Sequence, residues 1–142
     1  MIVVDASVLA AFIRKEPNWE KLADIVKQCV TVDLALKEVL NAVWKDVAVR
    51  KVISEDVAAK LRQVLHLMVG INVLVEPGDR YLDKAFEIAL KNNITVYDAL
   101  YIALASEKSL PLATLDERQA AVAKAAGVRV LVPIGYQSTR TS

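Results

Sequence analysis

Four acidic residues lie at positions where a charged side chain is costly or unexpected in a soluble chain. They are Asp5, Glu38, Asp98 and Asp116. Asp5 closes an apolar run typical of a buried strand, and Asp98 lies near the start of the most apolar segment of the chain. A buried charge costs free energy unless it is paired with an opposite charge or binds a metal. Few cations stand nearby in the sequence, so a divalent metal is the natural partner.

Each of the four carboxylates also has a purely structural interpretation. Asp5, Asp98 and Asp116 stand where they can cap a helix or favour its dipole, and Glu38 lies on a polar stripe with Asn41. Taken together, they favour an all-oxygen site that suits Mg²⁺ or Mn²⁺ rather than Zn²⁺. Such ions lower the pKa of bound water, and two of them about 3.5–4 Å apart stabilise the attacking and leaving oxygens of a phosphodiester. That chemistry is typical of nucleases.

The elements that must position these carboxylates alternate between strand and helix. Short apolar, largely β-branched runs predict strands at 2–4, 30–32, 73–75, 112–114 and 128–132. Apolar residues three and four apart predict helices at 7–14, 19–26, 34–49, 54–69, 81–91, 96–107 and 117–126. This alternation predicts an α/β fold, a three-layer α/β/α sandwich with a central, mostly parallel sheet. Ligand sites in such sheets lie beyond the carboxyl ends of the strands, where Asp5 and Asp116 stand.

Some of these helices carry more specific predictions about their ends and faces. Asn18 is expected to cap the helix over 19–26, and Thr95 is expected to cap the helix over 96–107. The helix over 81–91 is expected to turn four apolar side chains toward the core: Leu82, Ala85, Phe86 and Ala89.

Composition limits the kind of protein without identifying its function. The 142 residues predict one domain over 1–135 and a short polar tail over 136–142. The apolar fraction of 55% exceeds the usual ~45–50%, which favours a surface buried against another subunit. The lone Cys29 and the absence of a long apolar window favour a cytoplasmic protein away from membranes. A net charge of +1 excludes nucleic-acid binding by bulk positive charge.

Several common site types are missing from the sequence. It contains neither a GxGxxG pattern nor a Walker-type GxxxxGK(S/T) pattern, so a nucleotide cofactor is not expected. One His and one Cys, far apart, exclude a His/Cys zinc site and argue against a catalytic triad. With no plausible nucleophilic side chain, a covalent enzyme intermediate is not expected either.

The acidic residues fall in four segments, in order along the chain. These segments are VVDASVL at 3–9, EVLNAVWK at 38–45, TVYDALYIALA at 95–105 and LATLD at 112–116. The ordered set resembles the PIN domain, the ribonuclease fold of VapC-type toxins in toxin–antitoxin pairs. The resemblance runs from the first strand to Val132, nearly the whole chain. It implies a metal-dependent endoribonuclease that hydrolyses RNA phosphodiester bonds and acts as the toxin of a type II pair.

The resemblance also implies roles for individual residues. The expected catalytic and metal-binding residues are Asp5, Glu38, Asp98 and Asp116, with Mg²⁺ or Mn²⁺ as cofactor. Ser7 and Thr114 are expected to orient these carboxylates or to hold metal-bound water, and Asn41 is expected to be a neighbouring polar support. The expected partners are the RNA substrate, a second copy of the chain, and an antitoxin whose C-terminal segment lies over the acidic groove.

Two positions depart from the PIN pattern. Asp33 replaces a proline often found before the second motif, and it either adds charge to the rim or caps the following helix. Gln119 replaces an aromatic residue found in many members three positions after the last aspartate. His66 is expected at the surface or half-buried rather than in catalysis. The larger aromatic residues are expected in the core or in a dimer interface rather than as base-stacking platforms: Trp19, Trp44, Tyr97 and Tyr101.

The sequence leaves the role of the basic residues open. Arg14, Lys15, Arg50, Lys51 and Arg62 either steer RNA phosphates toward the acidic site or are merely solvated. Two rival functions also stay open. One is a catalytically silent PIN-like module that binds RNA or protein, and the other is a small metal-dependent phosphoester hydrolase on the same architecture. The complete carboxylate set favours the active enzyme over the silent module.

Overall fold

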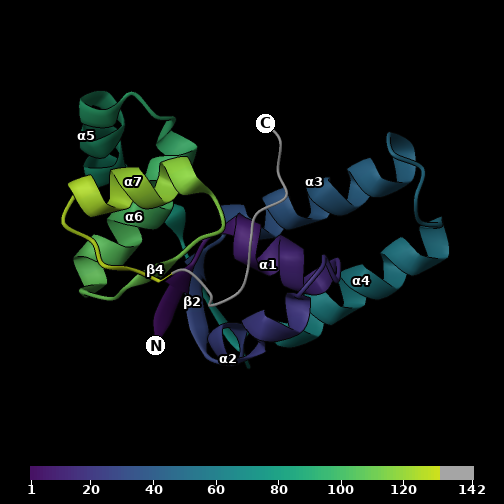
Figure 1. Ribbon diagram of the computed structural model, residues 1–142. Coiled ribbons are helices and arrows are strands. Elements are labelled where there is room, and N and C mark those ends of the chain that lie inside the picture. The colour runs from purple at the N-terminus through teal and green to yellow at the C-terminus, as the bar shows by residue number, and fades with distance from the viewer. Residues whose placement is uncertain (132–142) are drawn as a thin grey trace.

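Within residues 1–131, which the computed structural model describes, five short strands form a parallel sheet at the centre of the molecule (Figure 1). The strands are β1 (Ile2–Val4), β2 (Cys29–Val32), β3 (Val73–Glu76), β4 (Leu112–Ala113) and β5 (Val130–Leu131). Their order is β3-β2-β1-β4-β5, and every neighbouring pair is parallel. β1 lies in the middle, and its Ile-Val-Val sequence suits a strand covered on both faces.

Helices cover both faces of this sheet, which confirms the three-layer α/β/α sandwich (Figure 1). They are α1 (Ala6–Ile13), α2 (Ala23–Val26), α3 (Leu34–Ala48), α4 (Glu55–Met68), α5 (Leu82–Asn92), α6 (Val96–Lys108) and α7 (Glu117–Ala125). Helices α1 to α4 lie on one side of the sheet and α5 to α7 on the other. Right-handed crossovers explain this division, because the chain first steps from β1 outward to β3 and then returns to β4 and β5.

The helix ends follow the predicted capping with one exception. The side chains of Thr95 and Asp116 accept hydrogen bonds from amides in the first turns of α6 and α7. Asn18 does not cap a helix: its φ of +69° is left-handed, whereas a capping residue needs extended backbone. The predicted helix over 19–26 is accordingly divided into a 3₁₀ turn, η1 (Trp19–Leu22), and the short α2.

The predicted inner face of α5 is wrong for two of its four side chains. Ala85 and Ala89 are buried, as expected, but Leu82 and Phe86 are 43% and 54% exposed, and Ile88 is buried in their place. The helix follows the 3₁₀ turn η2 (Gly78–Tyr81) and packs against α6. Small alanine side chains allow close approach to α6, and this contact sets the rotation of α5. The larger apolar side chains are thereby left on the outer face.

Helix α6 is the centre of the core and contacts β1, β2 and β4. Every residue from Ala99 to Ala105 is buried, including Tyr101. Trp44 and Tyr97 lie outside the core, since both are more than half exposed. Trp19 is half-buried and packs edge-on against Phe12, with ring centroids 5.5 Å apart. Tyr101 therefore lies in the core, whereas Trp44 and Tyr97 do not, and the dimer-interface alternative for these two stays a prediction.

Asp33 does not cap α3. Its Oδ1 instead accepts a hydrogen bond from the backbone N–H of Gly78 at 3.1 Å, which ties the start of α3 to η2. His66 is exposed on α4, as expected. No helix among residues 1–131 is long and apolar enough to cross a membrane. The predicted domain end at 135, the tail over 136–142 and the last residue of the strand expected at 128–132 lie outside the described residues.

Candidate active site

Asp5 follows the central strand β1 directly and is the N-cap of α1. It is only 5% exposed. Its Oδ1 accepts hydrogen bonds from the Ser7 hydroxyl at 2.5 Å and from the Val8 backbone N–H at 3.3 Å. Its Oδ2 accepts a hydrogen bond from the Thr114 hydroxyl at 2.5 Å. These donors are neutral, so they fix the orientation of the carboxylate without cancelling its charge.

Hydrogen bonds also join the end of β1 to the end of β4, the neighbouring strand. The Ser7 hydroxyl accepts from the Leu115 backbone N–H at 2.9 Å, and the Thr114 hydroxyl accepts from the Asp116 backbone N–H at 3.1 Å. Because parallel neighbours present their carboxyl ends at one edge of a sheet, Asp5 and Asp116 lie at the same place in the fold. Ser7 and Thr114 hold this edge together.

Helices α3 and α6 bring the other two carboxylates to the same edge. Asp98 lies in the first turn of α6, and Glu38 lies early in α3. The Tyr101 hydroxyl donates a hydrogen bond to Glu38 Oε1 at 2.5 Å and so links the two helices. Tyr101 was not predicted as part of the site, although it lies three residues after Asp98 and therefore shares its helix face.

The four carboxylates line one pocket of about 1010 Å³. Ser7, Asn41, Tyr101 and Gln119 line it as well. Thr114 is buried behind the pocket and reaches it through Asp5. The structure therefore gathers residues that are more than a hundred positions apart in the sequence.

Like charges and burial set the electrostatics of this pocket. Burial raises the pKa of Asp5 to about 6, and the charge of Asp116 adds to the rise, although the hydrogen bonds from Ser7, Thr114 and Val8 oppose it. Burial likewise raises the pKa of Glu38, with a further contribution from Asp98. Asp98 also has a raised pKa, from loss of solvation and then from the charge of Asp116. Burial and the neighbouring carboxylates thus outweigh the charge of Arg118, which lowers the pKa of Asp98.

The donor set fits a hard divalent cation, because it consists of carboxylate, hydroxyl and amide oxygens. Among residues 1–131, no three His, Cys, Asp or Glu side chains are gathered as a ready-made metal site. Asp5 and Glu38 are held instead by hydroxyl donors, and Asp116 by the first amides of α7. Metal ligation by Asp5, Glu38, Asp98 and Asp116 stays a prediction.

Gln119, at the position of the missing aromatic residue, has a structural part in the site. Its side-chain Nε2 donates to the backbone carbonyl of Asp98 at 2.8 Å, and its backbone N–H donates to Asp116 Oδ1 at 3.1 Å. Gln119 is buried and ties the start of α7 to the start of α6. It thereby keeps two of the carboxylates beside each other.

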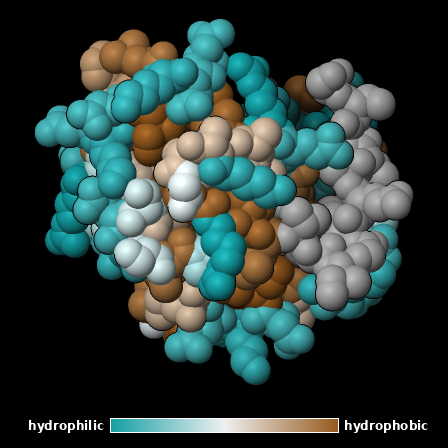
Figure 2. All heavy atoms as spheres, turned by 60° about the vertical axis from the view of Figure 1, so that its left-hand side comes forward, coloured by the Kyte–Doolittle hydropathy of each residue, from teal (hydrophilic) through white to brown (hydrophobic). Residues whose placement is uncertain are grey.

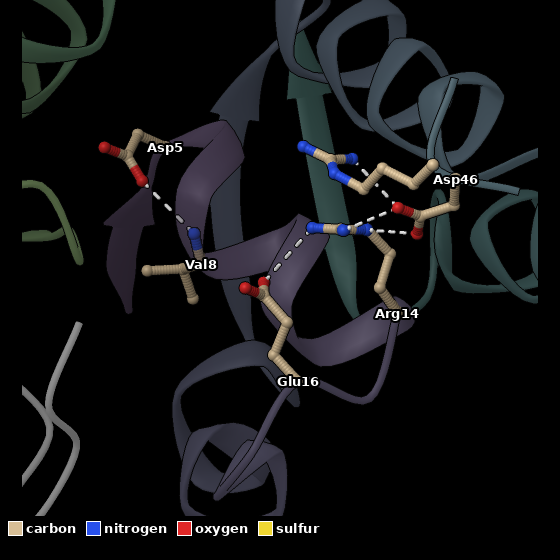
Figure 3. A network of polar contacts seen from close by, with 6 residues as sticks. Asp5, Val8, Arg14, Glu16 and Asp46 are labelled. Atoms are coloured by element: carbon tan, nitrogen blue, oxygen red, sulfur yellow. Dashed lines mark hydrogen bonds and ion pairs between the residues drawn. The ribbon is translucent and has the colours of Figure 1, made fainter. Parts of the chain in front are cut away.

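A second charged cluster lies at the other end of the pocket and was not predicted (Figure 3). Asp46 of α3 accepts from Arg14 Nε at 2.8 Å and from Arg14 Nη2 and Arg50 Nη1 at 2.9 Å each. These hydrogen bonds and the positive charges of the two arginines hold the pKa of Asp46 below its usual range. Arg14 and Arg50 both line the pocket that contains Asp5. The sequence named Arg14 and Arg50 as candidates for contact with RNA phosphates, but it did not predict their pairing with Asp46.

A pocket lined by four carboxylates at the end of a parallel α/β sheet suits a hard divalent metal ion, and such ions assist phosphoester hydrolysis. The comparison with protein families is more specific, since residues 2–125 match the model of the PIN domain. The chain belongs to the PIN-domain family.

Two curated relatives and a solved structure agree with this assignment. The chain is 38% identical over 122 residues to ribonuclease VapC3 of Pyrobaculum aerophilum, covering 84% of this chain and 92% of that one. It is 31% identical over 124 residues to exonuclease VapC9 of the same organism, covering 87% and 86%. It also shares its fold with a toxin–antitoxin complex from Klebsiella pneumoniae, with a TM-score of 0.67 and 13% identity over 97% of this chain and 100% of that one.

Proposed function

We propose that this protein is a metal-dependent endoribonuclease that hydrolyses RNA phosphodiester bonds, and that it is the toxin of a type II toxin–antitoxin pair. The observation that carries this proposal is the gathering of Asp5, Glu38, Asp98 and Asp116 in one pocket, where the pKa values of the first three are raised. The PIN-domain assignment and the 38% identity to a VapC ribonuclease support the same nuclease function.

The four carboxylates would hold Mg²⁺ or Mn²⁺. Such an ion would lower the pKa of a bound water molecule and place a positive charge beside the phosphodiester. The residues of the chain prepare this site. Ser7 and Thr114 fix both oxygens of the Asp5 carboxylate, and Tyr101 fixes one oxygen of Glu38. No nucleophilic side chain takes part, so the reaction needs no covalent intermediate.

The partners follow from the surface and from the relatives. We propose an antitoxin partner because one protein of the same fold is described as a toxin–antitoxin complex and a relative carries the VapC name. We propose a homodimer because Leu82, Phe86 and Leu90 form an apolar stripe on α5 and are 43%, 54% and 69% exposed. Figure 2 brings the side of α5 to α7 forward and shows apolar side chains gathered there among polar ones.

Two further proposals concern organisation and location. We propose a single domain over 1–135, because one continuous sheet and core unite the described part of the chain and the PIN match spans residues 2–125. We propose a cytoplasmic protein, because the chain has one cysteine, Cys29, which is buried and forms no disulfide, and disulfides are rare in the cytosol.

The decisive experiment incubates purified protein with linear and circular RNA in Mg²⁺, in Mn²⁺ or in EDTA. Asp5→Asn protein purified in the same way excludes a contaminating nuclease. Metal-dependent cutting of the circular RNA, lost in the variant, is the expected result. Cutting of linear RNA alone would replace endonuclease by exonuclease, the activity named for one relative.

Two other outcomes would replace the proposed function. RNA binding without cleavage in any metal would favour the silent PIN-like module. Hydrolysis of p-nitrophenyl phosphate without RNA cleavage would favour the small phosphoester hydrolase.

A further inference from the structure

We infer that Arg50, held in place by the buried Asp46–Arg14 pair, forms with Lys45 a subsite for an RNA backbone phosphate next to the one that is cut. This inference rests on the proposed function and deepens it. The cluster lies at the end of the pocket opposite to the carboxylates, and the acidic site itself does not use it.

The helices α1 and α3 pack together, and each carries an acid of the pocket nearer its start and a base of the pocket nearer its end. Lys37 and Glu16 also line the pocket, so each end holds one charge of the opposite sign. α1 begins at Asp5 and ends at Arg14, as Figure 3 shows. α3 carries Glu38 in its first half and Lys45 in its last turn. Since an α-helix rises 1.5 Å per residue, Lys45 lies roughly 10 Å farther along the groove than Glu38. A group bound by Lys45 and Arg50 is therefore a different phosphate from one bound by the carboxylates.

Lys45 and Arg50 do not form ion pairs with the four carboxylates at the opposite end of the pocket. Among residues 1–131, no ion pair joins Asp5, Glu38, Asp98 or Asp116 to a cation of the pocket. The charges of the two ends therefore do not neutralise each other. An extended polyanion with a bound metal ion can contact both ends, because its phosphates bind the basic end and its metal ion binds the acidic end. RNA has this form.

The two arginines have different tasks. The Arg14 side chain is 15% exposed, and its guanidinium is bound to both oxygens of Asp46 and lies 3.5 Å from Glu16. The Arg50 side chain is 50% exposed and gives one donor, Nη1, to Asp46. Arg14 thus holds the Asp46 carboxylate in place, and Asp46 in turn orients Arg50. The other N–H groups of Arg50 can then bind a ligand in the pocket. Asp46 and Arg14 are positioning residues.

Guanidinium chemistry favours phosphate as this ligand. Arginine presents several donors in a rigid plane that matches two phosphate oxygens, and it loses less entropy on binding when that plane is already oriented. The buried Asp46 provides this orientation at the edge of the groove. A purely structural link between α1 and α3 would need only Arg14 and Asp46.

The test measures binding of a fluorescein-labelled single-stranded RNA to the full chain in EDTA across a series of salt concentrations. Asp98→Asn is present throughout, so that cleavage does not interfere. Adding Arg50→Gln is expected to reduce the slope of log affinity against log salt by about 0.7, which is roughly an eightfold loss at 50 mM salt. Lys45→Gln is expected to act similarly. Lys124→Gln, the same charge change at an exposed residue of α7 outside the pocket, is expected to leave the slope unchanged.

Asp46→Asn separates positioning from charge. The variant makes the groove more positive by one charge, so a purely electrostatic role predicts tighter RNA binding. We expect weaker binding, because Arg50 loses its fixed orientation. Arg50→Lys, which keeps the charge and loses the planar fork, is expected to recover only part of the affinity. Thermal unfolding of each variant identifies any that does not fold.

The outcomes distinguish this subsite from the proposed function. If the wild-type chain cuts RNA while Arg50→Gln and Lys124→Gln have equal slopes, the subsite is wrong and the nuclease function stands; an acidic peptide then becomes the better ligand for the basic end. If the RNA binds with the predicted slope loss but is not cut, the subsite stands and the hydrolysis is wrong. Absence of RNA binding in EDTA overturns the subsite, and the cleavage experiment in Mg²⁺ or Mn²⁺ decides the nuclease function separately.

Discussion

Asp5 and Asp46 are the same residue type and are 5% and 6% exposed. Asp5 lines the groove, whereas Asp46 is bound by Arg14 and Arg50, which line it. Their surroundings nevertheless shift their pKa values in opposite directions. Burial raises the pKa of Asp5 to about 6, and its hydrogen-bond partners are two hydroxyls and an amide. Asp46 receives its hydrogen bonds from Arg14 and Arg50, which lower its pKa.

The comparison shows that the loss of solvation and the charge of the donors act together: burial contributes most to the pKa of Asp5, whereas hydrogen bonds from Arg14 contribute most to the pKa of Asp46. Hydroxyl donors orient Asp5 and leave its charge available for a cation. Guanidinium donors neutralise Asp46 and make it part of the scaffold. An uncompensated carboxylate in a pocket is therefore a better pointer to function than burial alone.

The largest expected difference between the two aspartates concerns activity. Asp5→Asn is expected to lower RNA cleavage in Mg²⁺ by about a thousandfold, because the lost charge stabilises the reacting groups, and to leave the thermal stability of the metal-free protein undiminished. Single-turnover cleavage and a melting curve in EDTA check both statements. A variant that retains activity would remove Asp5 from the proposed catalytic set.

For Asp46, in contrast to Asp5, a substitution is expected to lower the stability of the fold. Asp46→Ala removes the carboxylate that accepts two hydrogen bonds from the nearly buried Arg14, and a loss of about 3 kcal/mol in the free energy of unfolding is expected. Urea denaturation measures this loss. Glu16→Gln is the matched control, because it removes a looser contact to the same guanidinium and is expected to cost less than about 1 kcal/mol. Equal losses in the two variants would mean that Asp46 stabilises the fold no more than Glu16 does.

A pH series in EDTA sharpens the contrast further. The folded-state pKa of Asp5, about 6, lies above its unfolded value of 3.8, so the folded protein binds this proton more tightly. Stability is therefore expected to rise by about 1 kcal/mol between pH 7 and pH 5. Asp46 has the opposite sign, because its lowered pKa contributes stability that is lost as the pH falls below the usual aspartate range.

Urea denaturation at pH 7, 6 and 5 checks this profile. The gain on acidification should shrink in Asp5→Asn, leaving the smaller contributions of Glu38 and Asp98, whose raised pKa values have the same sign. An unchanged gain in that variant would assign the effect to other groups.

The smallest expected effect compares two buried threonines. Thr114 donates to Asp5 Oδ2, whereas Thr31 donates to the backbone carbonyl of Val4 at 2.7 Å. Thr31→Val removes one buried hydrogen bond, and Thr114→Val removes both the one to Asp5 and the one from the Asp116 backbone N–H. The expected loss in stability is about 1 kcal/mol for each bond. Only Thr114→Val is expected to lower RNA cleavage as well, by about tenfold, because it frees the Asp5 carboxylate. Similar activity in both variants would confine Thr114 to a structural role.

Local sequence patterns were sufficient for much of the fold. The alternation of β-branched runs with segments of helical spacing predicted the parallel sandwich, since these periods reflect which side of each element is buried. The same reasoning predicted that Asp5 and Asp116 lie at one sheet edge, because both directly follow a strand. It failed on the face of α5, where Phe86 and Ile88 are equally apolar and only the contact with α6 decides which one is buried.

The sequence by itself determined the strands and most of the helices, and it singled out the four carboxylates as the residues to follow. Only the tertiary structure decided which partner each acid has: Tyr101 for Glu38 across 63 positions, and Arg14 for Asp46 across 32. The physical reason is that periodicity fixes the buried side of an element but not its rotation and shift against a neighbour. This rotation and shift decide whether a carboxylate accepts hydrogen bonds from a hydroxyl or from a guanidinium. They therefore decide whether its charge is neutralised or stays available for a cation.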